Sequence, residues 1–302
     1  MIRYRGCIFA ALALALCFGC VRSAADVSAV SPSAVPVTEA PTPAPTEEPT
    51  PTPSPTTTPS PTPTPTLEPT PEPITEERLQ SCEFDFFFDD AVFVGDSVTR
   101  TFNNYANARR KTEEGFLGEA RFMGAVAMSV MNASSNRAYP GGITFTVRGK
   151  PVSVTEGLNL LEAKKAFILL GGNDIGFRSW DAVEGYYARL IDLIHEQCPD
   201  TEVILQGVFP VTRDYCRTER VRIERWNSFN EILARVCDEH GATFLNFSDQ
   251  LKDEDGYLPD AFSSDRRDHL SEKGEEIWVR ALRLFAAQRL YPDAAVILSE
   301  SE

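Results

Sequence analysis

Three short segments carry side chains that together can cleave an ester. Ser97 ends the tripeptide Gly95-Asp96-Ser97, Asn173 follows Gly171-Gly172, and His269 stands in a polar segment near the end of the chain. A serine hydroxyl can attack a carbonyl carbon, a histidine can take the serine's proton, and an amide N–H can hold the negative oxygen that forms. The residue types therefore point to serine-based ester hydrolysis.

Ser97 is the candidate nucleophile because it follows an apolar run and opens a helical pattern. In such a strand-to-helix turn the hydroxyl is exposed. The serine N–H also lacks a partner within the first helical turn and can point at an oxyanion. The alternative is an ordinary turn and helix cap. No Gly-x-Ser-x-Gly pattern lies near Ser97, which argues against the nucleophile elbow of the α/β-hydrolases.

The base has to be one of three histidines. His195 and His240 stand late in helical patterns, where a histidine interacts favourably with the helix end. His269 instead lies in a polar loop, so we select it as the base. A carboxylate should orient its ring, and we choose Asp265, because Asp268 is the immediate neighbour of His269 and adjacent side chains diverge. The alternative is that both acids are solvated loop residues.

Three donors are candidates for an oxyanion hole. They are the backbone N–H of Ser97, the backbone N–H of Gly124, and the side-chain amide of Asn173. Gly171 and Gly172 would let the backbone approach a ligand closely. The alternative for this segment is a plain turn.

Strand and helix patterns alternate along the chain and place these residues. We expect strands at Ala91–Val94, within Ala120–Ala127, and at Ala166–Leu170, Glu202–Val208 and Thr243–Phe247. We expect helices at Ser97–Ala106, Leu158–Lys165, Asp181–Gln197, Glu219–His240 and Ser271–Leu290, with Ser271 as the last N-cap, and a small inserted β-hairpin within Thr144–Val154. Such alternation predicts a parallel sheet covered on both faces. Ligands bind such sheets at the carboxyl ends of the strands, where Ser97 and Asn173 both fall.

The first 25 residues have the pattern of a signal peptide. The apolar stretch Gly6–Phe18 is too short for a typical membrane span. Cys20, preceded by Leu16-Cys17-Phe18-Gly19, is a candidate for lipidation, and cleavage after Ala25 is the alternative. Both outcomes predict an extracytoplasmic protein, either a membrane-anchored lipoprotein or a protein secreted at the bacterial cell surface. Contact with a membrane is expected only through the signal or lipid anchor.

Residues 26–77 are rich in proline and threonine and poor in large apolar side chains. Such a segment cannot bury enough surface to offset the entropy of ordering it, and its repeated prolines favour an extended polyproline II form. We therefore expect three parts: a signal peptide at 1–25, a disordered stalk at 26–77, and one catalytic domain at 78–302.

The charge and the cysteine content limit the classes of binding partner and of metal site that we expect. The net charge is -15 at pH 7, and no basic run follows the N-terminal segment, so we expect no nucleic-acid partner. The domain contains Cys82, Cys198, Cys216 and Cys237, whose spacing matches no zinc site. Export permits disulfides, but free thiols and every pairing of the four remain open. We expect a monomer and no metal.

In these segments the chain resembles the SGNH (GDSL-type) esterase superfamily, which is named for a serine, glycine, asparagine and histidine in that order. The matching positions are Ser97, Gly124, Asn173 and His269, and the resemblance extends roughly from Phe84 to Leu290. It implies a three-layer α/β/α sandwich of flavodoxin-like type with a five-stranded parallel sheet. It also implies hydrolysis through an acyl-serine without a metal or organic cofactor.

Two positions depart from the family pattern. Val98 follows the serine where the family has leucine. The family places its acid three residues before the histidine, where this chain has Arg266, whereas Asp265 lies four before. A bulge of one residue would restore the contact between Asp265 and His269. The alternative is a Ser97–His269 dyad helped by a backbone carbonyl.

We therefore expect an exported serine esterase that acts on esters of small molecules or polysaccharides. The sequence contains no long apolar lid, which favours O-acetyl or other short acyl groups on carbohydrate. A lipase or lysophospholipase that takes longer acyl chains is one alternative. A surface binding module that has lost catalysis and an acyltransferase on the same scaffold are the others.

Overall fold

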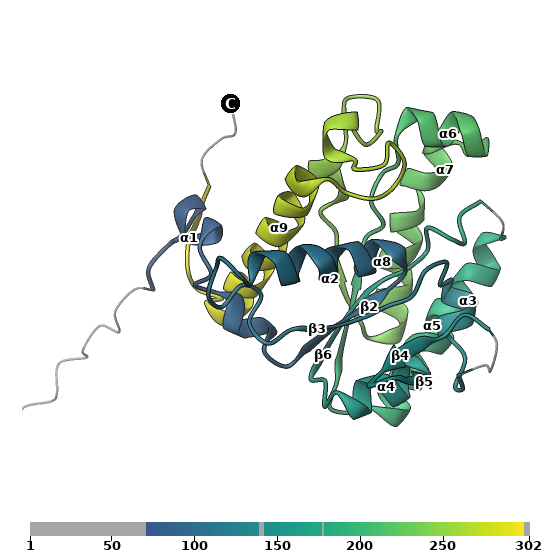
Figure 1. The fold of residues 1–302 in the computed structure, drawn as a ribbon, viewed down its shortest axis with the longest axis horizontal. Helices are drawn as coiled ribbons and strands as arrows, with labels where there is room; N and C mark the ends of the chain where they lie inside the picture. The colour runs from purple at the N-terminus through teal and green to yellow at the C-terminus, as the bar shows by residue number, and fades with distance from the viewer. Residues whose placement is uncertain (1–70, 139–141, 177, 299–302) are drawn as a thin grey trace, which may run out of the picture. The chain divides into compact units, whose positions relative to one another are not determined.

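Five strands form one parallel sheet in the computed structural model, which describes residues 71–138, 142–176 and 178–298 (Figure 1). In spatial order they are β3 (Arg121–Gly124), β2 (Ala91–Gly95), β6 (Lys165–Leu169), β7 (Glu202–Gln206) and β8 (Thr243–Leu245). Every neighbouring pair is parallel. The five-stranded parallel sheet expected from the sequence is confirmed.

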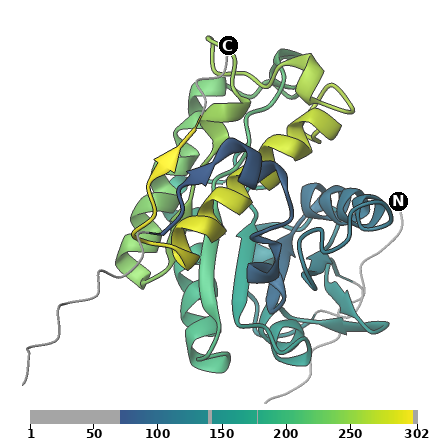
Figure 2. The same ribbon diagram turned by 90° about the vertical axis from the view of Figure 1, so that its left-hand side faces the viewer.

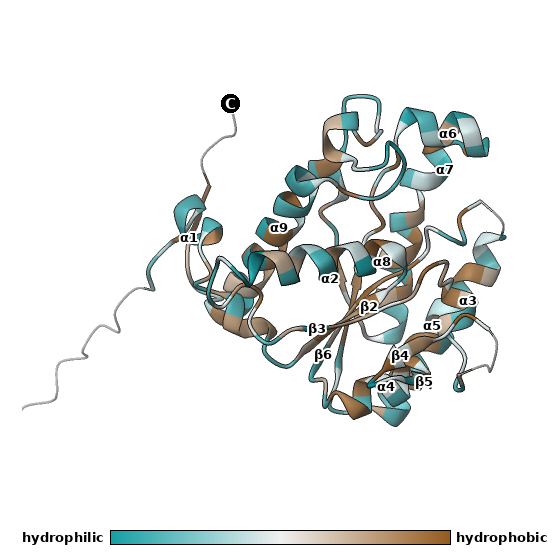
Figure 3. Cartoon of the chain, viewed as in Figure 1, coloured by the Kyte–Doolittle hydropathy of each residue, from teal (hydrophilic) through white to brown (hydrophobic). Residues whose placement is uncertain are grey.

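Side chains of the central strands alternate between two separate cores. Val92 and Val94 of β2 enter one core, and Phe93 enters the other. A period of two is the geometry of a strand, and both faces are apolar because a parallel sheet is covered on both sides. In Figure 3 the strands are mainly brown, whereas the helix at 213–219 on the rim is mainly teal.

Helices cover both faces of the sheet, which confirms the three-layer α/β/α prediction. The core around Phe93 receives side chains from α1 (Glu76–Gln80), α2 (Ser97–Arg109) and α9 (Glu272–Leu290). The opposite core receives them from α3 (Val130–Ala133), α4 (Val154–Leu160), α5 (Trp180–Gln197), α6 (Arg213–Glu219), α7 (Ile223–Asn227) and α8 (Phe229–His240). Short 3-10 turns lie at Asp85–Phe88, Ser248–Leu251 and Asp260–Phe262.

A small hairpin is inserted between β3 and β6, as expected. Its strands β4 (Phe145–Val147) and β5 (Lys150–Val152) pair antiparallel. Arg148 and Gly149 make the turn, with φ of 49° and 78°. Two successive positive φ values are typical of the tight turns that match the twist of a hairpin.

Two helix predictions are wrong at their boundaries. The helix expected at Leu158–Lys165 is α4, which begins at Val154 because Ser153 and Glu156 form a capping box. The single helix expected at Glu219–His240 is broken into the end of α6, then α7 and α8. Arg220 ends α6 in a left-handed conformation with φ of 56°, so no helix continues through it.

The folded domain begins earlier than the predicted boundary at residue 78. Strand β1 (Ile74–Thr75) pairs in parallel with β9 (Val296–Ile297), and the Ile74 side chain is fully buried. Figure 2 shows this yellow C-terminal strand beside the blue segment that starts the domain. Residues 74–77, assigned to the stalk, therefore belong to the domain. The expected signal peptide, Cys20 and the rest of the stalk up to residue 70 lie outside the described residues.

All four cysteines of the domain are free thiols, so none of the pairings left open by the sequence is present among them.

None of the described helices is both long and apolar enough to cross a membrane.

Candidate active site

The carboxyl ends of three neighbouring strands bring the candidate residues to one edge of the sheet. Gly95, the last residue of β2, is in register with Gly124 on one side and Leu169 on the other. Ser97 opens α2 directly after β2, and Asn173 follows β6. The serine, the glycine and the asparagine thus lie where the parallel sheet offers a ligand site.

Asp96 ties these segments together. Its Oδ1 accepts a hydrogen bond from the Val98 N–H at 2.9 Å, which caps α2, and its Oδ2 accepts one from Asn173 Nδ2 at 3.0 Å. The side chain is only 5% exposed. Burial raises the pKa of Asp96 to about 7, although the bond from Val98 acts to lower it, and the nearby charge of Asp268 raises it further. Asp96 was not among the residues predicted from the sequence, although an aspartate just before a helix is a recognisable N-cap signal.

Asn173 is held by two acceptors of the protein. Besides the bond to Asp96, its Nδ2 donates to the Met128 carbonyl at 3.1 Å. An amide nitrogen carries two hydrogens, so both are engaged in this structure. To act as the predicted oxyanion donor, Asn173 has to exchange or share one of these bonds when an ester is attacked.

The next residue, Asp174, attaches the loop to α3. It is fully buried, its Oδ2 accepts a hydrogen bond from the Val130 N–H at 2.9 Å, and its Oδ1 pairs with Arg178 at 3.1 Å. This contact joins the loop after β6 to the first residue of α3. The contact was not predictable from the local sequence because Val130 is 44 residues away along the chain.

Two of the glycines are required by close packing. A Cβ on Gly124 would lie 2.8 Å from the backbone nitrogen of Arg100 in α2. Gly171 has φ of +118°, and a Cβ there would lie 2.5 Å from the ring of Phe229. Only glycine can stand at such positions without strain. The backbone of the candidate oxyanion hole is thus set by the packing of the helices on either face.

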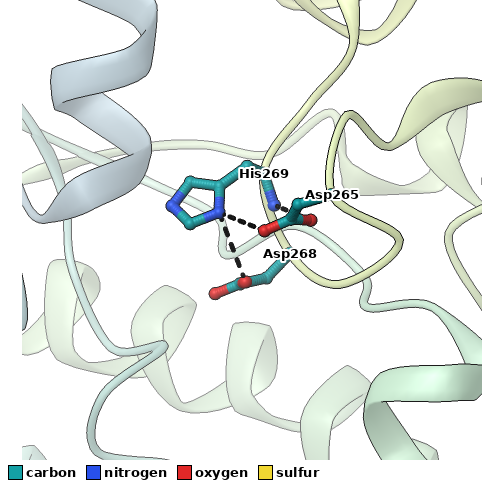
Figure 4. A group of neighbouring side chains, drawn as sticks. All are labelled: Asp265, Asp268 and His269. Carbon is teal, nitrogen blue, oxygen red and sulfur yellow. Dashed lines mark hydrogen bonds and ion pairs between the residues drawn. The ribbon is translucent and has the colours of Figure 1, made fainter.

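His269 and Asp265 form a hydrogen-bonded pair (Figure 4). His269 Nδ1 and Asp265 Oδ2 are 2.5 Å apart, whereas Asp268 Oδ1 lies 3.6 Å from the same nitrogen. Burial acts to raise the pKa of Asp265, but the hydrogen bonds from the His269 ring and the Arg267 N–H outweigh it and lower the pKa. Asp265 is thus the acid that can orient the imidazole, as chosen from the sequence. Its catalytic role remains a prediction.

A left-handed residue absorbs the extra position between the acid and the histidine. Arg266 has φ of 60°, which is unusual for a residue with a Cβ. Its carbonyl accepts a hydrogen bond from Thr212 Oγ1 at 2.6 Å, and the Arg267 carbonyl accepts one from the Thr212 N–H at 3.0 Å. The buried Thr212 thus fixes the bulge that lets Asp265 reach His269.

The serine turn and the loop of His269 are not joined by a direct hydrogen bond between their reacting groups. Within the described residues, no hydrogen bond joins Ser97 to His269. Asp96 is nonetheless close enough to His269 and Asp268 for their charges to shift its pKa. The ligand atoms of Asp265, Asp268 and His269 lie within 4.8 Å of one another, so this is also the place in the described chain where a metal ion could bind. The hydrogen bond between Asp265 and His269 occupies Oδ2 of the first and Nδ1 of the second.

A small apolar cavity opens beside the serine turn. Its volume is about 30 Å³. The lining residues are Asp96 and Val98 on either side of Ser97, together with Leu169, Leu170, Gly172, Val208, Phe209, Trp226 and Asp268. A cavity of this size has room for about one small group.

Comparisons with known proteins bear on the family and the fold of this chain. The family model described as GDSL-like lipase/acylhydrolase matches residues 93–277, more than half of the chain. A crystal structure from Bacteroides fragilis, provisionally described as an acylhydrolase, is 15% identical with a TM-score of 0.51 over 74% of this chain and 92% of that chain. At this identity the likeness shows a shared fold.

Two further solved structures are similar to a lesser degree. One from Streptococcus pneumonia, provisionally described as a platelet activating factor, is 18% identical with a TM-score of 0.49 over 70% of this chain and 92% of that chain. A GDSL-like lipase from Bacteroides thetaiotaomicron is 15% identical, also with a TM-score of 0.49, over 67% of this chain and 89% of that chain. No curated protein matches the sequence.

Proposed function

Because the chain belongs to the GDSL-like lipase/acylhydrolase family, and is thus a carboxylic ester hydrolase, we propose that it removes short acyl groups, above all acetyl, from carbohydrate through an acyl-Ser97 intermediate. The observation that carries this proposal is the Asp265–His269 hydrogen bond, beside a serine that opens a helix at the carboxyl edge of the sheet. A nucleophile, a base and an orienting acid are the groups that acyl transfer to serine needs.

In the proposed reaction, the Ser97 hydroxyl attacks the ester carbonyl carbon while His269 takes its proton. Asp265 holds the ring by its hydrogen bond to Nδ1, which leaves Nε2 for the proton. The N–H groups of Ser97 and Gly124 and the amide of Asn173 stabilise the oxyanion. His269 then gives the proton to the leaving alcohol. A water molecule, activated by His269, hydrolyses the acyl-serine and frees the acid.

The small cavity beside the serine turn supports a short acyl group. Val98 and Asp96 border it from the serine side, and Leu169, Val208 and Trp226 form its apolar wall. At about 30 Å³ it accommodates the methyl of an acetyl group. A longer acyl chain would have to continue through the open side of the cavity, without this apolar wall around it. This favours acetyl esters over the longer esters that a lipase or lysophospholipase takes.

The experiment is hydrolysis of p-nitrophenyl acetate, butyrate and octanoate by the full chain, with Ser97→Ala alongside and a fluorophosphonate probe as a label for the nucleophile. We expect acetate to be hydrolysed best, and Ser97→Ala to lose both turnover and label. Equal turnover in Ser97→Ala would overturn the proposed nucleophile, and a preference for octanoate would favour the lipase alternative. Added acceptor sugar that receives the acyl group would indicate an acyltransferase. A chain that neither turns over nor labels would indicate a binding module.

We also propose that the protein acts outside the cytoplasm. The support is the apolar stretch Gly6–Phe18 followed by Cys20, together with the proline-rich segment that precedes the domain. Labelling of cells with a lipid precursor, compared between the full chain and Cys20→Ala, tests lipidation. Release of the Cys20→Ala variant into the medium is the expected result, and equal lipid labelling of the two proteins would contradict it.

A further inference from the structure

The small cavity beside the serine turn borders all three segments that carry the proposed reacting groups. Its lining includes the two neighbours of Ser97, the residue before Asn173 and the residue before His269, which are Asp96, Val98, Gly172 and Asp268. An ester whose carbonyl carbon is attacked by Ser97 therefore has one of its substituents next to this cavity. The residues that bound the cavity then decide which esters fit.

Gly172 leaves space in this cavity because it has no side chain. A Cβ built on it would lie 3.7 Å from Asp96 Oδ2 and 3.8 Å from Trp226 Cη2, and both of these residues line the cavity. These are ordinary van der Waals distances, and the φ of Gly172 lies outside the left-handed region, unlike that of Gly171. The fold therefore has room for alanine at this position, with the added methyl group inside the cavity.

Trp226 of α7 bounds the cavity on the side to which this Cβ would point. The edge of its six-membered ring, Cζ2 and Cη2, faces Gly172. The side chain is only 3% exposed, its Nε1 donates a hydrogen bond to the Phe209 carbonyl, and its ring packs edge-on against Tyr215 with centroids 5.5 Å apart. Turning the indole aside for a longer acyl chain would cost both of these contacts.

We propose that Gly172 and Trp226 determine which acyl groups react at Ser97. The missing side chain of Gly172 leaves the space for the methyl of an acetyl group, and the ring of Trp226 limits the depth of that space. The proposal rests on the proposed function and names the residues that set its acyl specificity. The cavity of about 30 Å³ holds one small group. A formyl group would leave it empty, and a butyryl group has two more carbons than an acetyl group.

The test measures kcat/KM of the full chain on ethyl formate, ethyl acetate and ethyl butyrate, which differ only in the acyl group. In Gly172→Ala the added methyl takes up the cavity, so we expect the ratio of acetate to formate turnover to fall about 10-fold. A side chain that disturbed Asn173 would instead lower the turnover of both esters by the same factor. That result would overturn the proposal for Gly172.

Gly176→Ala is the matched control. Gly176 lies in the same loop after β6, and a Cβ on it would also meet an ordinary contact, Val221 Cγ2 at 3.8 Å. Gly176 is not among the residues that line the cavity. The ratio of acetate to formate turnover should therefore keep its wild-type value. An equal fall in this variant would mean that the effect of Gly172→Ala arises from the loop, which contradicts the proposal.

Trp226→Leu tests the other wall by the opposite change. Leucine is shorter than the indole, so the cavity deepens where the six-membered ring stood. We expect the ratio of butyrate to acetate turnover to rise about 10-fold, the gain from burying two further methylene groups. Circular dichroism and urea unfolding establish that the variant is folded, and an unchanged ratio in the folded variant would overturn the role of Trp226. Gly172→Ala tests the same cavity if Trp226→Leu does not fold.

Ser97→Ala, assayed on the same three esters, keeps this proposal separate from the proposed function. Loss of turnover in Ser97→Ala together with unchanged ratios in the cavity variants would refute the specificity residues and leave the nucleophile standing. Full turnover in Ser97→Ala would refute the proposed function. A wild type that hydrolyses none of the three esters would contradict both.

Discussion

The two loops that supply polar groups to the active site are built in opposite ways. The loop after β6 is fixed by long-range contacts: Asp174 is fully buried and reaches α3, and Asn173 is bound to Asp96. The loop that contains Asp265 and His269 is half-exposed and held mainly by bonds among its own residues. Its anchors outside the loop include the two bonds from Thr212 and the ion pair of Arg267 with Glu219.

We therefore expect substitutions in the two loops to affect stability and reaction rate differently. Changes in the loop of Asn173 should cost both folding energy and rate, because the loop is part of the core. Changes in the loop of His269 should cost rate and little stability, because few core contacts depend on it. The predictions below test this division, in order of decreasing effect.

The largest effect is expected for His269→Ala. Loss of the base should lower kcat/KM on p-nitrophenyl acetate by at least about 10³-fold, while the urea midpoint stays within error of the wild type. Steady-state kinetics and urea unfolding measure the two quantities on the same preparation. A large drop in stability would show that the exposed loop is part of the folding unit.

The choice of acid gives the next effect. Asp265→Asn should lower kcat/KM by about 10²–10⁴-fold, because the amide cannot stabilise a protonated His269 through Nδ1. Asp268→Asn is the matched control, 3.6 Å from the same nitrogen, and should cost less than about 10-fold. A reversed order would assign the role to Asp268 and make the bulge at Arg266 irrelevant to catalysis.

The raised pKa of the buried Asp96, which binds the loop of Asn173, predicts a pH dependence of the free energy of unfolding. The unfolded carboxyl ionises near pH 4, whereas in the fold its pKa is about 7. Between these values the folded state retains a proton that the unfolded state has released. The free energy of unfolding should therefore fall as pH rises from about 4 to 7, by up to about 4 kcal/mol.

Asp96→Asn removes this titration and preserves the helix cap. The difference in unfolding free energy between wild type and variant, followed by urea titration at each pH, should change over the same range. Glu275 also has a raised pKa, but it does not act on Asp96 and cancels in the difference. The charges of Asp268 and Asp174 do act on Asp96, so their coupling to Asp96 is part of the measured difference. A difference that is flat with pH would contradict the buried state of Asp96.

Asp174→Ala should lower the free energy of unfolding by about 3 kcal/mol, because it leaves the Val130 N–H and the Arg178 guanidinium without their partner. The same variant should also lower kcat/KM, since Asn173 adjoins it. Chemical denaturation followed by tryptophan fluorescence gives the first quantity. A rate loss with unchanged stability would show that this loop is as independent as the loop of His269.

The smallest effect is expected for Thr212→Val. It removes the hydroxyl that donates to the Arg266 carbonyl and caps α6 by accepting from the Tyr215 N–H, and it keeps the backbone bond to Arg267. We expect a loss of about 1–2 kcal/mol in unfolding free energy and a fall of a few-fold in kcat/KM. Both are measured as for His269→Ala. A fall as large as that of Asp265→Asn would mean that the bulge depends on this single hydroxyl.

The sequence was sufficient for features that depend on local pattern. The apolar runs predicted all five strands, and the turn after β2 predicted the position of Ser97. The choice of Asp265 over Asp268 agrees with the hydrogen bond to His269. Local chemistry could have corrected one error, since Ser153 and Glu156 carry the capping-box pattern that starts α4.

Features that depend on distant partners were not predictable in this way. Ile74 pairs with a strand more than 200 residues later in the chain. Its local sequence is rich in proline and gives no sign that it belongs to the domain. Asp174 meets Val130 only after β3 and β6 have paired with the two sides of β2. The break at Arg220 arises because a residue with a Cβ adopts a left-handed conformation, which no residue type signals.

The position of β1 has a mechanical consequence. Strand β1 pairs with β9, and Glu76 of α1 is bound to Arg280 of α9, about 12 Å along that helix from its first residue, Glu272. A force applied to the chain ahead of residue 71 therefore acts first on this two-residue strand and short helix. Their partners are β9 and the middle of α9, so the N-terminal end of the domain is attached away from the loop of His269.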